Sequence, residues 1–434
     1  MADYRQMWLE LGLDLERHDA LLCAIPALYQ STYLSQRDRP RAMDYFDFVV
    51  SEIHGLRVKE LVDHKARGGK VFGTFCIYVP EELVLAAGGI SVGLCAGAEL
   101  SIGTAEEVLP RNICPLIKAA FGFRLERICP YFQASDLIVG ETTCDGKKKV
   151  WEILADYAPV YVMEVPQRKG TRAEELWYGE LLRFKDRVEE VTGNKVTAEG
   201  LSRAVALADA KRAALERLYS LRKADPSPIS GLDALLVMQV SFYDDPARFT
   251  RQTNLLCDEL EQRVAHGSGV APKGAPRVLV AGSPMAIPNW KLHSVVEKAG
   301  AVVVCEESCT GTRSLTGPTS RDGQKLEDML SAIARRQLRA NCACFTPNDE
   351  RVDDIIRLSR EYGVDGVIHY ALQFCQPYML ESVKVRKALA REGVPLLTLE
   401  TDYGDGDVGQ LTTRVEAFLE MTGSRGRQIQ TQRG

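Results

Sequence analysis

The stretch "DLIVGETTCDGKKKVWEILADY", residues 136–157, indicates how this chain folds. Its apolar first part, which ends at Cys144, is typical of a buried strand, and the residues after the Asp-Gly turn have the spacing of a helix. A strand followed at once by a helix is the repeating unit of a parallel sheet. At the junction, Cys144 could be a nucleophile, a metal ligand or an inert thiol.

Strand–helix alternation recurs in two regions of the chain. The first region holds the predicted strands "GKVFGTF", "ISVGLCAG", "DLIVGETTC" and "PVYVMEVPQ", and the second holds "RVLVAGS", "AVVVCEES", "GVIHYALQF" and "VPLLTLETD". Between the two regions, long helical patterns dominate. The sequence therefore predicts an α/β protein with two parallel-sheet domains, each with helices on both faces of its sheet.

A chain of 434 residues is too long for one ordinary core, so we expect several parts. The predicted parts are an N-terminal helical segment (1–66), α/β domain I (67–170), a helical connector and linker (171–276), α/β domain II (277–421) and a disordered tail (422–434).

Composition and charge exclude several classes of protein. The content of 45% hydrophobic and 26% charged residues is that of a soluble globular protein. The net charge of −5, with no basic stripe, argues against nucleic acid as a partner. The N-terminus lacks the pattern of a signal peptide, and no apolar run approaches the roughly 20 residues of a membrane span. We therefore expect a cytoplasmic protein.

The twelve cysteines are the main anomaly of the composition. In a reducing compartment, so many thiols indicate metal binding or redox chemistry rather than disulfides. No C-x-x-C pair is present, so the fold must bring any ligands together. The alternative is a small buried hydrophobe, which we expect for Cys23, Cys257 and Cys305.

Four cysteines follow the carboxyl ends of predicted strands, where parallel sheets bind ligands. These are Cys76, Cys144, Cys309 and Cys375, and Cys114 stands just before a predicted helix. Helix N-termini offer unpaired amides and a positive dipole end, both of which favour thiolate. We therefore predict that these five are ligands.

Other cysteines are harder to place. In "NCACFTPNDER" either Cys342 or Cys344 is expected to face the crevice, and Cys95 and Cys129 are alternatives to Cys76. The lysine run 147–149 is interpreted as a solvated face rather than a source of positive potential at Cys144.

Six motifs resemble the 2-hydroxyacyl-CoA dehydratase/benzoyl-CoA reductase D-component family over roughly residues 66–421, and within it most closely the double-cubane cluster proteins. They are "GTFCIYVPEEL", "RNICPLIKAAFGF", "GETTCDGKKK", "SCTGTR", "CACFTPNDER" and "QFCQPYMLES". This resemblance implies two flavodoxin-like domains with an iron–sulfur cluster between them.

The resemblance also implies a ligand set. Its dehydratase members bind one 4Fe-4S cluster through three cysteines, which match Cys114, Cys144 and Cys375 here. Double-cubane members carry two 4Fe-4S cubanes bridged by sulfide, and the surplus cysteines that suit the second cubane are Cys76, Cys309 and Cys344, with Cys342 nearly as good a match as Cys344.

Three functions follow from this resemblance. The first is a homodimeric, anaerobic iron–sulfur reductase that reduces a small molecule with low-potential electrons from a separate ATP-hydrolysing 4Fe-4S activator. The second is the 4Fe-4S subunit of a 2-hydroxyacyl-CoA dehydratase, and the third is a non-catalytic electron carrier. The chain has no G-x-x-x-x-G-K-[ST] loop, so any ATPase must be a partner.

Three further residues are candidates for groups around the cluster. They are Glu82, His369 and Arg313 of the "CTGTR" loop. Glu82 has a plain alternative as a helix-start carboxylate, and His369 has one as a hydrogen-bonded core histidine.

Overall fold

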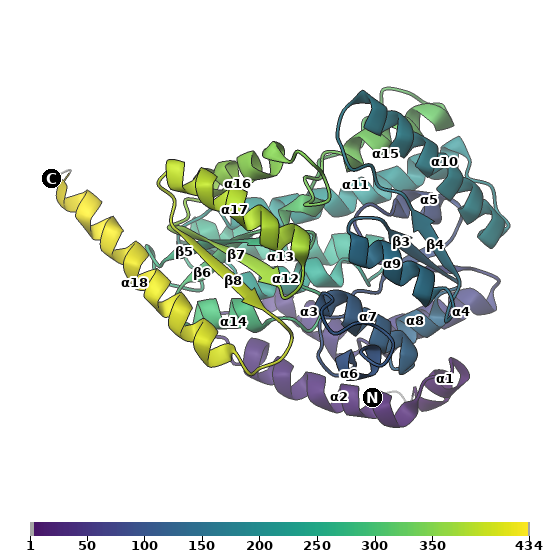
Figure 1. The fold of residues 1–434 in the computed structure, drawn as a ribbon, viewed down its shortest axis with the longest axis horizontal. Coiled ribbons are helices and arrows are strands. Elements are labelled where there is room, and N and C mark those ends of the chain that lie inside the picture. The colour runs from purple at the N-terminus through teal and green to yellow at the C-terminus, as the bar shows by residue number, and fades with distance from the viewer. Residues whose placement is uncertain (1–3, 433–434) are drawn as a thin grey trace.

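The computed structural model describes residues 4–432, with side chains through residue 423. It contains two four-stranded parallel sheets, each surrounded by helices (Figure 1). The strand orders are β2-β1-β3-β4 and β6-β5-β7-β8, which follow the flavodoxin-like pattern. The predicted fold class is therefore confirmed: two flavodoxin-like domains with a helical N-terminal segment and a helical connecting region.

The first sheet follows a set of N-terminal helices. Its strands are β1 (Val71–Thr74), β2 (Ile90–Gly93), β3 (Leu137–Glu141) and β4 (Val160–Met163). The helices of this half are α1 (Arg5–Glu10), α2 (Leu15–Tyr29), α3 (Asp44–Ser51), α4 (Leu56–Ala66), α5 (Glu81–Ala86), α6 (Ile102–Ala105), α7 (Pro115–Leu125), α8 (Pro130–Ala134) and α9 (Asp145–Leu154). Strand β3 is buried along its whole length, as its apolar sequence predicts.

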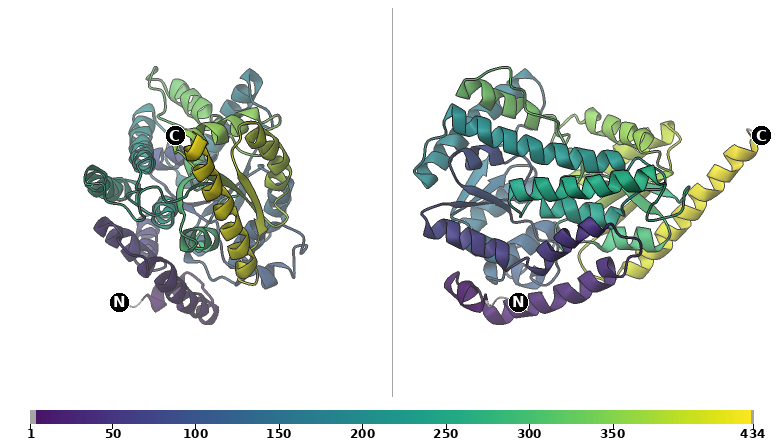
Figure 2. Two further views of the ribbon diagram at one scale, coloured as in Figure 1. Left: turned by 90° about the vertical axis from the view of Figure 1, so that its left-hand side faces the viewer. Right: turned by 180° about the vertical axis from the view of Figure 1, so that it is seen from behind.

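Long helices connect the two sheet domains and run along the back of the molecule (Figure 2). They are α10 (Thr171–Thr192), α11 (Ala198–Leu221), α12 (Gly231–Val240) and α13 (Pro246–Ala265). Helix α12 is buried over its whole length, which agrees with its mainly apolar sequence, and its two polar residues Asp233 and Gln239 are buried as well.

The second sheet repeats the architecture of the first. Its strands are β5 (Arg277–Gly282), β6 (Val302–Glu307), β7 (Gly366–Leu372) and β8 (Leu396–Thr401). The helices are α14 (Lys291–Lys298), α15 (Leu326–Gln337), α16 (Asp349–Glu361), α17 (Gln376–Arg391) and α18 (Val408–Gln432). A disordered tail is predicted for 422–434; helix α18 extends to Gln432, and residues 433–434 lie outside the described part.

One segment of the second half of the sequence packs on the connecting helix α10 and on the first domain. Helix α15 lies beside α10 (Figure 1), and the Trp177 indole donates a hydrogen bond of 3.0 Å to the Gln337 side chain. The Tyr78 hydroxyl donates one of 2.9 Å to the Ala340 carbonyl. The loop after α15, which carries Cys342 and Cys344, is therefore held against the first domain.

Glu82 connects three parts of the chain by buried ion pairs. Its carboxylate lies in the first turn of α5, 3.0 Å from the Arg212 guanidinium of α11 and 2.8 Å from that of Arg336 on α15. Burial alone would raise the pKa of Glu82, but the two arginines lower it to about 2. Glu82 is thus a helix-start carboxylate with a structural role.

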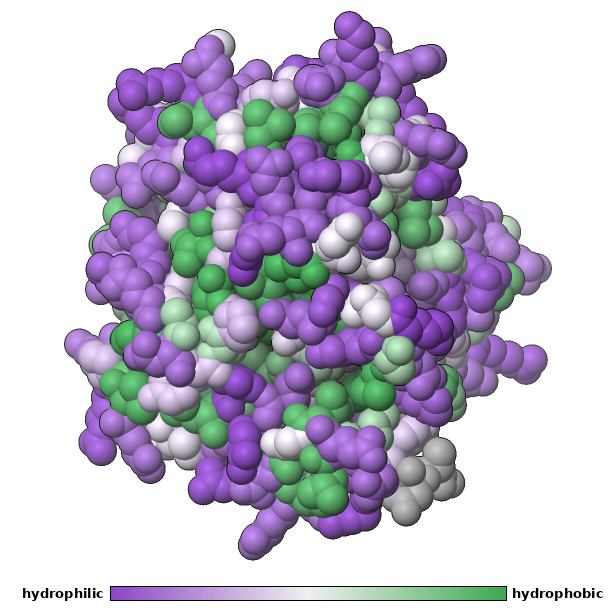
Figure 3. Space-filling view, turned by 90° about the vertical axis from the view of Figure 1, so that its right-hand side faces the viewer, coloured by the Kyte–Doolittle hydropathy of each residue, from purple (hydrophilic) through white to green (hydrophobic). Residues whose placement is uncertain are grey.

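Polar and apolar residues alternate on the surface of the protein. Figure 3 shows a face on which apolar residues lie in small patches separated by polar ones. Over the described residues, the helices are all too short or too polar to cross a lipid bilayer.

Candidate functional site

Three cysteines at helix N-termini form a first thiol group, defined as Cys114, Cys144 and Cys375. They are the N-cap residues of α7, α9 and α17, so the group draws on both sheet domains. A hydrogen bond between Cys114 and Cys375 raises the pKa of the first thiol and lowers that of the second, and Cys144 lies near enough to interact with both.

Helix amides stabilise the sulfurs of this group. The backbone N–H of Lys147 donates to Cys144 Sγ over 3.4 Å, and the amides of Leu116 and Tyr378 donate in the same way to Cys114 and Cys375. The sequence predicts these interactions from the strand–turn–helix pattern, and the structure contains them.

Four further cysteines form a second thiol group, defined as Cys76, Cys309, Cys342 and Cys344. Hydrogen bonds from Cys309 and Cys344 lower the pKa of Cys342 well below the usual thiol value. Burial raises the pKa of Cys76, which is close enough to Cys309 and Cys344 to raise theirs. Cys342 also lies close enough to Cys375 to raise the pKa of that thiol, so the two groups are neighbours.

All six predicted ligands therefore lie in one region between the sheet domains, together with Cys342. The alternatives Cys95 and Cys129 belong to neither thiol group, although Cys95 shares its neighbours Lys147 and Glu141 with Cys76. Cys95 Sγ donates to the Phe75 carbonyl over 3.3 Å, near Lys147, and Cys129 is the N-cap of the short helix α8. Burial raises the pKa of each of these two thiols to about 11.

The three cysteines that the sequence predicts to be buried and inert differ in their exposure to solvent. Cys257 and Cys305 are buried, as predicted. The prediction for Cys23 is wrong, because this residue is exposed. The buried residues of α2 are His18, Leu21 and Tyr29, whose helical spacing leaves Cys23 on another face.

The lysine run after Cys144 contains one largely buried residue, Lys147, which corrects the interpretation of 147–149 as a solvated face. Lys147 is 13% exposed and forms an ion pair with Glu141, whose side chain is completely buried. Nearby Lys147 lowers the thiol pKa values of Cys76 and Cys95, against the larger effect of burial. The sequence offers one signal for this pair: a carboxylate at the end of an apolar strand.

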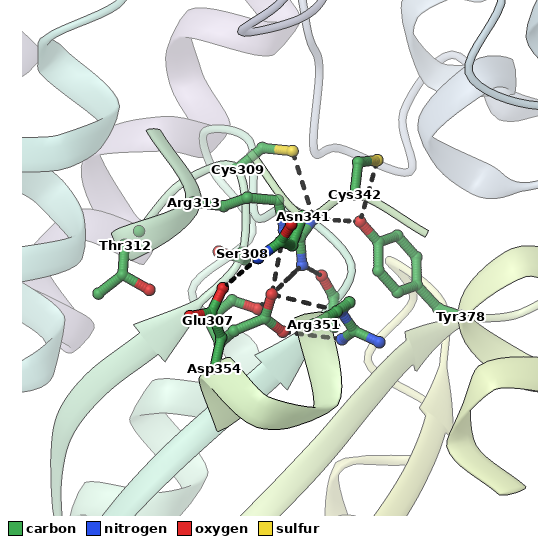
Figure 4. Close-up of polar contacts among 12 residues, drawn as sticks. Glu307, Ser308, Cys309, Thr312, Arg313, Asn341, Cys342, Arg351, Asp354 and Tyr378 are labelled. Atoms are coloured by element: carbon green, nitrogen blue, oxygen red, sulfur yellow. Dashed lines mark hydrogen bonds and ion pairs between the residues drawn. The ribbon is translucent and has the colours of Figure 1, made fainter. Parts of the chain in front are cut away.

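A polar network in the second domain surrounds Cys309 and Cys342 (Figure 4). The Arg313 guanidinium bonds to Glu307 at 2.8 Å, donates to Cys309 Sγ over 3.5 Å and contacts the Tyr378 hydroxyl. The sequence predicts Arg313 as a candidate near the cluster but gives no comparable signal for Tyr378.

His369 lies in strand β7 and is buried. Neither ring nitrogen has a hydrogen-bond partner among the described residues, and burial lowers its pKa to about 3. His369 therefore differs from the hydrogen-bonded core histidine that the sequence suggests as its alternative role.

The donor set suits an iron–sulfur cluster, because thiolates are the usual ligands of such clusters and amides commonly bond to their sulfurs. Within residues 4–432, no three His, Cys, Asp or Glu side chains are arranged to hold one metal ion. Cluster ligands bind separate irons, so they need not converge on one point.

Fold and site together define a class: a protein of two flavodoxin-like domains with a thiol-rich region between them. The family model described as "2-hydroxyglutaryl-CoA dehydratase, D-component" matches residues 76–422. The chain therefore belongs to this family, and the family-level resemblance inferred from the cysteine motifs is confirmed.

Individual relatives agree with this assignment. The Escherichia coli (strain K12) protein named "Putative dehydratase subunit YjiM" is 37% identical over 88% of this chain and 98% of the relative. The (R)-phenyllactyl-CoA dehydratase beta subunit of Clostridium sporogenes is 24% identical over 83% of this chain and 94% of its own length. The beta subunit of (R)-2-hydroxyglutaryl-CoA dehydratase from Acidaminococcus fermentans is also 24% identical, over 83% and 94%, respectively.

Proposed function

We propose that this protein is an iron–sulfur reductase with a double-cubane cluster between its two α/β domains. Cys114, Cys144 and Cys375 would hold one 4Fe-4S cubane, and Cys76, Cys309 and one cysteine of the 342–344 loop would hold the other, with a sulfide bridge between them. The single observation that carries the proposal is the adjacency of the two thiol groups: the Tyr378 amide donates to Cys375, and the Tyr378 hydroxyl lies 3.9 Å from Cys342 Sγ. Together the groups supply more than the six thiolates required.

The bound cluster would supply low-potential one-electron transfer to a small-molecule substrate. The residues of the chain hold and tune the thiolates: the N-terminal amides of α7, α9 and α17 donate to the first thiol group, and Arg313 donates to Cys309. Cys76 is preferred to Cys95 and Cys129 because it is close enough to Cys309 and Cys342 to interact with both thiols.

Electrons would come from a separate ATP-hydrolysing 4Fe-4S activator, since the chain has no phosphate-binding loop of its own. We propose a homodimer, because one chain already offers enough thiols for the cluster. The names of two relatives support a different arrangement, since both are beta subunits and so belong to assemblies with other subunits.

A second candidate is the 4Fe-4S subunit of a 2-hydroxyacyl-CoA dehydratase, in which only the first thiol group holds a cluster. This lyase is favoured by the name of the Clostridium sporogenes relative, a dehydratase of a 2-hydroxyacyl-CoA. A non-catalytic electron carrier is the third candidate. The dehydratase candidate leaves the second thiol group without the role that its clustering supports.

Iron content distinguishes the candidates. Purification and reconstitution without oxygen should yield about eight irons per chain for the double-cubane protein and about four for the dehydratase subunit. Zinc, or no metal at all, would contradict every iron–sulfur candidate. A carrier would take up iron but reduce no substrate when supplied with its activator and ATP.

A further inference from the structure

Arg313 is held in one orientation beside the second thiol group (Figure 4). Its side chain is buried, and its Nε and Nη2 donate to the same Glu307 oxygen over 3.0 and 2.8 Å. Nη2 also donates to the Glu307 carbonyl over 3.1 Å. These bonds leave Nη1 directed at Cys309 Sγ, 3.5 Å away, and at the Tyr378 hydroxyl.

The contact between Arg313 and Tyr378 determines where the hydroxyl hydrogen points. A guanidinium has donors only, so the Tyr378 oxygen must accept from Arg313. The hydroxyl hydrogen is then free for another acceptor, and Cys342 Sγ lies 3.9 Å from the oxygen. Arg313 thus acts on Cys309 directly and on Cys342 through Tyr378.

A second arginine holds the Tyr378 ring in place. The guanidinium carbons of Arg313 and Arg351 lie 5.2 and 5.1 Å from the ring centroid. Arg351 is itself fixed by Glu307 at 2.8 Å and by Glu381 at 2.5 Å. The hydroxyl therefore belongs to a rigid, buried donor, as required for an interaction that tunes a neighbouring sulfur.

The charges of this network balance before the thiolates are counted. The cations Arg313 and Arg351 face the anions Glu307 and Glu381, so the network adds no net charge. What it adds is two donors aimed at sulfur. Donors to cluster sulfurs stabilise the reduced, more negative state and so raise the reduction potential.

We infer that Arg313 and Tyr378 are positioning residues that set the reduction potential of an iron–sulfur centre held by Cys309 and Cys342. Their hydrogen bonds make this centre easier to reduce than it would be without them. This assignment rests on the proposed function, and it selects Cys342 rather than Cys344 as the ligand of the loop.

The test compares Tyr378→Phe, which removes only the hydroxyl, with Tyr362→Phe. Tyr362 is also buried in the second domain, and its hydroxyl donates to the Tyr219 carbonyl over 3.0 Å. The midpoint potentials of the reconstituted proteins are measured by redox titration followed by electron paramagnetic resonance, with iron content determined in parallel.

We expect Tyr378→Phe to keep its iron and to shift one midpoint potential to a more negative value, while Tyr362→Phe matches the wild type. An unchanged potential in Tyr378→Phe with full iron would overturn the inference alone. Loss of iron from Tyr378→Phe would overturn it too, because Tyr378 would then be structural. A wild-type protein that binds no iron would refute the proposed function as well.

Discussion

Lys147 contacts Cys144 with its backbone and Glu141 with its side chain. The amide donates to Cys144 Sγ over 3.4 Å, while the ammonium forms an ion pair with the Glu141 carboxylate at the end of β3. One residue thus joins the strand end, the thiol and the first turn of α9. The Glu141 carboxylate is completely buried and the Lys147 side chain is largely buried, so the carboxylate depends on the lysine for compensation of its charge.

Replacing Lys147 by Gln is therefore expected to destabilise the protein by roughly 3–5 kcal/mol, because it leaves the Glu141 carboxylate buried and unpaired. The measurement is urea unfolding of the iron-free protein. Lys149→Gln is the matched control. Lys149 belongs to the same run but is exposed, so its replacement should lower the free energy of unfolding by about 0.5 kcal/mol or less.

A double variant separates charge from packing. Glu141→Gln combined with Lys147→Gln should recover part of the lost stability, since no unpaired charge remains. If Lys147→Gln unfolds at the same urea concentration as Lys149→Gln, the pair does not have the energetic role that its burial indicates.

Replacing Cys144 by Ala should abolish iron binding at the first thiol group, because no neighbouring oxygen matches the softness of a thiolate. The variant should also lose stability in the iron-loaded state, since the cluster would connect the two domains. Iron content and thermal unfolding after reconstitution provide the measurement.

Cys129→Ala is the control for this experiment. Cys129 is likewise an N-cap residue, but it lies outside both thiol groups. It should keep its full iron, with a packing cost of about 1 kcal/mol. Full iron in Cys144→Ala would contradict the ligand scheme, and iron loss in Cys129→Ala would move the second site toward that residue.

The loop cysteines call for a paired comparison of their own. We expect Cys342→Ala to lose iron and Cys344→Ala to keep it, because Tyr378 faces Cys342. The opposite result would leave the cluster in place but assign its last ligand to Cys344. Iron and sulfide analysis of the two variants, reconstituted side by side, distinguishes these outcomes.

Much of this site is predictable from local sequence. Strand β3 follows directly from its apolar run, and the helix beginning at Pro115 makes Cys114 an N-cap residue. Because parallel strands present their carboxyl ends at one edge, the positions of Cys144 and Cys375 follow from the same pattern.

The grouping of the cysteines cannot be predicted in this way. Cys342 meets Cys76 only because α15 packs on α10 and holds the loop against the first domain. Likewise, a run of three lysines does not reveal that Lys147 turns inward. Its burial depends on Glu141, whose environment is set by the surrounding helices rather than by its neighbours in sequence.

The protein alone should not hydrolyse ATP. No phosphate-binding loop occurs in the sequence, and electron delivery is proposed to depend on a partner. Phosphate release by the purified, reconstituted chain should remain at the level of a blank, and it should appear only when an activator is added. Steady turnover by the chain alone would contradict this division of labour.

A buried histidine pair near the N-terminus makes stability depend on pH. His18 Nε2 lies 2.9 Å from His54 Nδ1, and the Trp8 indole donates to the His54 carbonyl over 2.7 Å. Burial lowers the pKa of His18 to about 4 and that of His54 well below its usual value. At pH values between the ordinary histidine pKa and these lowered pKa values, the unfolded chain binds more protons than the native protein.

Stability should therefore be complete above the ordinary histidine pKa and should fall as the pH decreases below it. Going from about pH 7.5 to about pH 5, we expect His18 alone to remove about 2 kcal/mol of unfolding free energy, and His54 to add to this loss. His18→Gln should reduce this pH dependence in urea unfolding, whereas His266→Gln, at an exposed position, should keep it. If the unfolding free energy of His18→Gln depends on pH as strongly as that of the wild type, His18 does not lower the stability of the native protein at acidic pH, contrary to what its burial predicts.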